Sequence, residues 1–156
     1  NYFFHMNYIV LPLLLFILPS SLHADEIGSV DTVFKFLGLN HKIVIETFDD
    51  PRVSGVTCHL NRAKAGGISG SLGIAEDKAE ASIASRQIGP IKLPLNLQSG
   101  ESVFSKKTSL VFKTIQVVRF YDKKRNVLIY LVYSDKLIEG SPKNSISTVP
   151  ILKWKQ

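Results

Sequence analysis

Apolar and polar residues alternate along much of the chain, which is the pattern of half-buried β-strands. Residues 28–50 contain two such stretches, separated by turn-forming residues at 38–41. Residues 56–60 alternate again and place the thiol of Cys58 on the apolar face and the imidazole of His59 on the opposite, wetter face. The first part of the chain therefore predicts a hairpin followed by a third strand.

The second half of the chain favours β-structure more strongly. The pattern predicts strands around residues 83–88 and 102–105, a long strand at 110–121 and another strand at 127–133. The polar residues 122–126 form the connection between the last two, which predicts a hairpin. Because residues 127–133 are apolar on both faces, we expect a central strand that is covered on both sides.

Glycines and prolines mark where the regular pattern stops. Residues 66–73 are too rich in glycine for regular structure and predict a loop, and residues 74–82 have the composition of a short helix. Pro150 restricts the last segment to an edge strand or a loop. The expected fold is mainly β, an antiparallel sandwich or a curved, partly closed sheet with one or two short helices, with an α+β fold as the alternative.

The N-terminus has the features of a secretory signal peptide. Residues 9–18 form an apolar run of about half the roughly 20 residues that span a bilayer, and Ala24 supplies the small residue before a cleavage point. We expect residues 1–24 to be removed and residues 25–156 to form a single domain. The alternatives are a buried N-terminal helix and a retained membrane anchor.

Composition limits the chemistry of the remaining domain. The chain has 156 residues, of which 45% are apolar and 21% charged, values typical of one globular domain. A single cysteine excludes a disulfide within the monomer and a zinc site built mainly from thiolates. Only His41 and His59 accompany Cys58 after removal of the signal peptide, so we expect no metal ion and no other cofactor.

Positive charge is concentrated in residues 106–125. The whole chain has a formal net charge of +6, and this stretch holds seven bases against the single acid Asp122, so that the rest of the chain is balanced. We predict that an anionic ligand binds to these seven side chains, which are Lys106, Lys107, Lys113, Arg119, Lys123, Lys124 and Arg125. Lys113 and Arg119 share one face of the expected strand, and the last three lie at the hairpin tip.

The expected partner is a small anionic molecule, a lipid headgroup or an envelope protein. Nucleic acid is not expected, because the signal peptide directs the chain out of the cytoplasm, and the chain is not expected to be an integral membrane protein. The alternative interpretation of the basic hairpin is a solvated surface whose lysines discourage aggregation through strand edges.

Other candidate sites are weak. The glycines of residues 66–73 match neither phosphate-loop spacing nor the nucleophile elbow of hydrolases. Cys58 and His59 are neighbours on a strand and point to opposite faces, so they cannot form a catalytic dyad. The leading hypothesis is a non-enzymatic binding or accessory module. The alternative is an envelope hydrolase or transferase in which folding brings His41, Cys58 and a carboxylate together.

Several runs of the sequence together carry a resemblance that covers the whole expected domain. They are residues 25–35, 41–51, 56–58, 62–67, 72–77, 87–90, 108–122 and 133–146. In these runs the chain closely resembles the CreA family. The resemblance implies a small periplasmic protein of Gram-negative bacteria, from a family named for a catabolite-regulation gene cluster. It implies no particular reaction, substrate or catalytic residue.

The family resemblance also implies one departure, at Ser85. Members of the family carry a second cysteine at this position, before a Gln-(Val/Ile)-Gly-Pro segment, where this chain has serine. The resemblance therefore implies that Cys58 has lost its disulfide partner. Such a crosslink is worth ~2 to 4 kcal/mol of stability, which this chain must obtain otherwise.

Overall fold

Eight β-strands make up the part of the chain that the structure describes. The computed structural model describes residues 23–33, 36–37, 40–66, 81–108, 113–136 and 143–155. Most of the expected signal peptide and most of the glycine-rich loop and expected helix lie outside these residues. The prediction of a helix at residues 74–82 is wrong for its last two residues, because Ala81 and Ser82 begin a strand.

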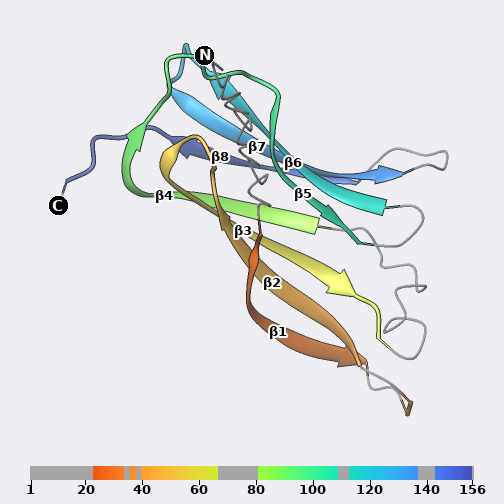
Figure 1. Ribbon diagram of the computed structural model, residues 1–156. Helices are drawn as coiled ribbons and strands as arrows, with labels where there is room; N and C mark the ends of the chain where they lie inside the picture. The colour runs from red at the N-terminus through yellow and green to blue at the C-terminus, as the bar shows by residue number, and fades with distance from the viewer. Residues whose placement is uncertain are drawn as a thin grey trace, which may run out of the picture.

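The first four strands form one antiparallel sheet in sequence order (Figure 1). They are β1 (Asp25–Val33), β2 (His41–Asp49), β3 (Ser54–Lys64) and β4 (Ala81–Lys92). In β3 the alternation places Cys58 and Leu60 in the core and leaves His59 exposed, which confirms the predicted faces of this strand.

The last four strands form a second antiparallel sheet, also in sequence order. They are β5 (Glu101–Lys107), β6 (Lys113–Asp122), β7 (Val127–Lys136) and β8 (Asn144–Pro150). The predicted hairpin is confirmed by the pairing of β6 with β7, from Lys113 opposite Lys136 to Asp122 opposite Val127. β7 is a central strand, as predicted, but it is not covered on both sides: Leu128 and Tyr130 are buried, whereas alternate residues such as Ile129 are partly exposed on the outer face of the sandwich. β8 is an edge strand, one of the two forms predicted for this segment.

The two sheets pack face to face and form the expected β-sandwich. Buried apolar side chains from both sheets fill the space between them, and the rings of Phe48 on β2 and Phe104 on β5 stack with centroids 4.6 Å apart. The apolar faces predicted from the alternation therefore meet across one continuous core.

The edge strands β4 and β8 lie beside each other and join the sheets on one side, as Figure 1 shows. The amide N–H of Ser85 donates to Ser147 Oγ at 2.8 Å. Further along, the side-chain amide of Gln87 accepts from the N–H of Leu152 at 3.1 Å and donates to its carbonyl at 2.9 Å. Because residues 85 and 87 meet residues 147 and 152 in the same order, β4 and β8 end at the same end of the sandwich.

A buried arginine links the sheets inside the core. The side chain of Arg119 on β6 is fully buried, and its Nη1 donates to both oxygens of Asp50 at 2.6 and 2.8 Å. Its Nη2 contacts Glu101 on β5. The sequence prediction placed Arg119 on a ligand-binding face, but residues of its parity on β6, such as Val117, are buried, so this face is the core.

Asp50 is held from several directions at the end of β2. The N–H groups of Arg52 and Val53 each donate to its Oδ1 at 2.9 Å. The hydroxyl of Tyr130 on β7 donates to its Oδ2 at 2.8 Å. Charge-assisted hydrogen bonds of this kind offset the cost of burying the carboxylate and the guanidinium.

Replacing Arg119 by methionine is expected to destabilise the protein strongly. Arg119→Met leaves the carboxylate of Asp50 buried without its cation, and we expect the free energy of unfolding to fall by ~3 to 5 kcal/mol. Urea denaturation followed by circular dichroism measures the change. Arg125→Met is the control, because the Arg125–Asp122 pair lies at the surface, and its midpoint should stay near that of the wild type. Equal losses in both variants would contradict the assigned role of Arg119.

Candidate functional site

The structure distributes the seven predicted ligand-binding cations over three places. Lys106 and Lys107 lie at the end of β5, and Lys113 begins β6 beside them. Arg119 is in the core. The turn after β6 holds Lys123, Lys124 and Arg125 at the opposite end of the sandwich, where Arg125 pairs with Asp122 at 2.8 Å. The predicted residues therefore do not form one surface.

Lys106 belongs to a second cluster of charged side chains, together with Glu46 and Arg62. Arg62 on β3 donates from Nε and Nη2 to the two oxygens of Glu46 at 3.2 and 3.1 Å. Lys106 Nζ approaches Glu46 Oε1 to 2.5 Å from the other sheet. Glu46 is almost completely buried, so two cations share one carboxylate between the sheets.

Glu46 remains ionised because of these two cations. Burial by itself would raise the pKa of this carboxyl, but hydrogen bonds and charge attraction from Arg62 and Lys106 outweigh it and hold the pKa below its usual value. The cluster of two bases and one ionised acid keeps an excess of one positive charge.

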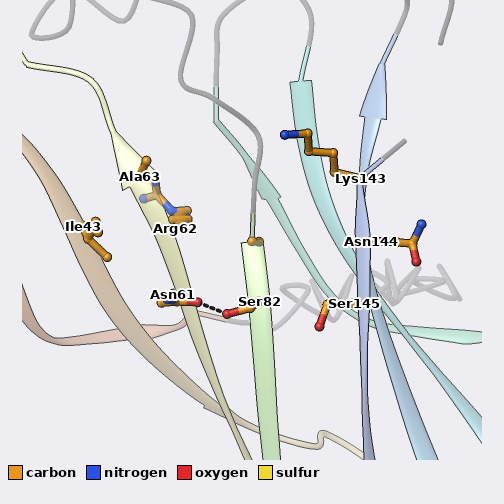
Figure 2. Close-up of a pocket in the computed structure, with 9 residues that line it drawn as sticks. Ile43, Asn61, Arg62, Ala63, Ser82, Lys143, Asn144 and Ser145 are labelled. Atoms are coloured by element: carbon orange, nitrogen blue, oxygen red, sulfur yellow. Dashed lines mark hydrogen bonds between the residues drawn. The ribbon is translucent and has the colours of Figure 1, made fainter. Parts of the chain in front are cut away.

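A pocket of about 440 Å³ opens beside this cluster, where β3 and β4 meet the start of β8 (Figure 2). Its described lining contains two cations, two amides, two hydroxyls and three apolar residues, and no carboxylate. These residues are Arg62, Lys143, Asn61, Asn144, Ser82, Ser145, Ile43, Ala63 and Ala81. A space of this size accommodates a small molecule.

The polar side chains of the pocket come from both sheets. Asn61 and Ser82 face each other across β3 and β4 and are hydrogen-bonded, as Figure 2 shows. Asn144 and Ser145 come from β8 of the other sheet. The amide groups of Asn61 and Asn144 and the hydroxyl of Ser145 can donate hydrogen bonds to oxygen atoms, whereas Ser82 donates its proton to Asn61. Arg62 and Lys143 add positive charge. The arrangement suits a small anion with several oxygen acceptors.

Cys58 and the histidines do not come together. The side chain of Cys58 is fully buried, and burial raises the pKa of its thiol to about 12. His41 lies at the start of β2, where its Nδ1 accepts from the N–H of Gly66 at 2.8 Å, whereas Cys58 pairs with Phe48 near the other end of that strand. Within the described residues, no group of three His, Cys, Asp or Glu side chains has the arrangement of a metal site.

Cys58 and Ser85 lie directly opposite each other on β3 and β4. Ser85 Oγ donates to Cys58 Sγ at 2.8 Å. The backbone of Ser85 turns toward Ser147 on β8, and the carbonyl of Cys58 accepts from Thr47 on β2. The two residues thus form a non-hydrogen-bonded pair, whose Cα atoms are typically about 4.5 Å apart, within the range of disulfides.

Comparison with known proteins agrees with the resemblance seen in the sequence. A family model described as CreA protein matches residues 27–154. The chain belongs to the CreA family. Protein CreA of Escherichia coli K12 is 58% identical over 154 residues, which cover 96% of this chain and 98% of the relative. The proteins of the same name from E. coli O6:H1 strain CFT073 and E. coli O157:H7 give the same values.

The remaining comparisons add two findings about this CreA-family chain. No solved structure matches it. Among the residues that the structure describes, no helix is both long and apolar enough to cross a membrane.

The sequence analysis missed Arg62 and Lys143 as candidate binding residues. Arg62 is followed by one further base, Lys64, and Lys143 follows two acids and one base in residues 135–139, so neither belongs to a marked cluster of bases. Arg62 lies on β3 of the first sheet, and Lys143 directly precedes β8 of the second. Local charge counting gives no signal for such a pair. Only the meeting of β3, β4 and β8 brings them to one pocket.

Cys58 is expected to be unreactive in the folded protein. With a pKa of about 12 and no exposed surface, its thiol is almost entirely protonated at pH 8, and thiolate is the reactive form. A thiol-specific chromogenic reagent should detect no cysteine in native protein and one per chain in denaturant. Rapid labelling of native protein would show that the thiol is accessible.

Ser85→Cys is expected to form a disulfide with Cys58. Under oxidising conditions the new bond should stabilise the protein by ~2 to 4 kcal/mol, because it restricts the unfolded chain. Mass spectrometry without reductant and urea denaturation measure the two effects. Ala84→Cys is the control, since Ala84 pairs with His59 on the opposite face and cannot reach Cys58. A free thiol pair in Ser85→Cys would contradict the opposed geometry.

Proposed function

We propose that this CreA-family protein is a non-enzymatic binding module, exported to the periplasm, that holds a small anion in the pocket between β3, β4 and β8. The observation that carries the proposal is the composition of the described pocket lining. It combines the cations Arg62 and Lys143 with four neutral hydrogen-bonding side chains and includes no acid. Phosphate or carboxylate oxygens match such a set of donors.

The cluster behind the pocket supports this assignment. Glu46 accepts two hydrogen bonds from Arg62 and so fixes the orientation of a guanidinium that lines the pocket. Lys106 neutralises Glu46 from the opposite sheet, so that the carboxylate does not cancel the positive charge of the pocket wall. In this arrangement Lys106, one of the residues predicted from sequence, supports binding without lining the pocket.

Two further observations favour a binding role outside the cytoplasm. The buried position of Cys58 and its distance along the sheet from His41 give these residues no shared surface on which a substrate would react. The apolar run at residues 9–18, followed by Ala24, has the pattern of a secretory signal peptide. Export agrees with the periplasmic location implied by the family resemblance.

Titration with inorganic phosphate tests the proposed site. In amide NMR spectra at constant ionic strength, phosphate should shift the signals of Ser82, Asn144 and Ser145. Lys143→Gln removes one cation from the pocket lining, and we expect the affinity to fall by about tenfold, which corresponds to ~1.4 kcal/mol.

Lys107→Gln is the matched control for this experiment. It makes the same change of charge at the same end of the sandwich, on an exposed side chain that does not line the pocket. Its affinity for phosphate should stay within about twofold of the wild type, since exposed charges are screened by salt. Shifts confined to the turn at 122–126, or equal losses in the two variants, would reject the pocket as the binding site.

A further inference from the structure

Three segments meet at the end of the sandwich that lies away from the pocket. They are the end of β4 with the residues that follow it, the β6–β7 turn at 122–126 and the C-terminal residues 151–155. Asn126 joins the last two, because its carbonyl accepts from the N–H of Ile151 at 3.0 Å and its side chain donates to the Ile151 carbonyl at 3.2 Å. Figure 1 shows the ends of β4 and β8 and the start of β7 together beside the C-terminus.

This end exposes large apolar side chains. Leu95, in the connection between β4 and β5, is fully exposed, and Leu152 and Trp154 of the C-terminal segment are 66% and 45% exposed. Trp154 is the only tryptophan of the chain. Exposing such residues costs free energy in water, and three of them on segments at one end of the sandwich suit a surface that contacts another apolar phase.

The same three segments carry exposed bases. We define the C-terminal surface as these three apolar residues together with the exposed bases Lys92, Lys123, Lys124, Arg125, Lys153 and Lys155. In residues 92–100, 122–126 and 151–155 the single acid is Asp122, and Arg125 is hydrogen-bonded to it. The surface is therefore both apolar and strongly basic.

We propose that the C-terminal surface docks the protein onto a membrane whose lipids carry negative charge. Tryptophan and leucine enter the boundary between headgroups and acyl chains, and lysines beside them attract anionic headgroups. In the segment Leu152-Lys153-Trp154-Lys155 the two kinds of residue alternate. A soluble anion would need the cations alone, and the exposed Trp154 and Leu152 favour a bilayer surface.

Docking in this way leaves the anion-binding pocket accessible. The pocket is lined by the start of β4 and the start of β8, whereas the C-terminal surface follows the ends of the same two strands. The twelve residues of β4 separate the two by roughly 35 Å. The pocket therefore faces away from the membrane, and the docking proposal does not depend on what the pocket binds.

The fluorescence of Trp154 tests the proposal on the full chain. At low salt, vesicles of equal parts phosphatidylcholine and phosphatidylglycerol should shift its emission to shorter wavelength, because the indole leaves water. Vesicles of phosphatidylcholine alone, or high salt, should abolish the shift. If the chain bound vesicles through another part, including the apolar run at 9–18, Trp154 would stay in water and its emission would not shift. An unshifted emission with the anionic vesicles would therefore overturn the proposal.

Charge variants show whether the C-terminal surface is responsible. Each base near an anionic leaflet contributes about fivefold to the affinity, so the double variant Lys153→Gln/Lys155→Gln should bind the anionic vesicles about 25-fold more weakly. The double variant Lys64→Gln/Lys107→Gln removes the same charge from exposed lysines near the pocket and should bind as the wild type does. If both double variants lost the same affinity for the anionic vesicles, binding would depend only on the net charge of the protein, and the proposal would be overturned.

Discussion

The pairing of Arg119 with Asp50 is the constraint on which the arrangement of the two sheets depends. A guanidinium in the core must find carboxylates there, and both partners of Arg119 come from other strands: Asp50 from the end of β2 and Glu101 from β5. Apolar packing alone would tolerate small slides of one sheet over the other. The directional hydrogen bonds from Arg119 and Tyr130 to Asp50 oppose such slides and hold the two sheets in register.

Ion pairs within and between the sheets engage three acids of the described part of the chain. Asp50, Glu101 and Glu46 are all engaged by bases within or between the sheets. Their partners include Arg119, Arg62 and Lys106, so these pairs remove positive charge from solvent together with negative charge. Among the described residues, exposed bases lie at both ends of the sandwich, and those at each end come from segments that are distant in sequence.

Local patterns predicted much of the fold and little of the candidate sites. Strict alternation around Cys58 identified a strand and its buried face, and the apolar run of β7 after a polar turn identified the β6–β7 hairpin, because these features depend on neighbours in sequence. The same apolar run predicted burial of both faces of β7, but a two-layer sandwich buries only one. The charge of Arg119 suggested solvent where the fold has a core. The pocket escaped prediction because Arg62 and Lys143 meet only after the two sheets associate.

The contact between β4 and β8 also protects two strand edges at once. Unpaired backbone groups at the rim of a sheet invite pairing with a second molecule, and here each of these two strands covers the rim of the other. Side chains make this connection. The side-chain amide of Gln87 bonds both the N–H and the carbonyl of Leu152, as the backbone of a neighbouring strand would. The two sheets therefore remain separate along this side. Even so, neither β4 nor β8 presents an uncovered edge there with which a strand of another molecule could pair.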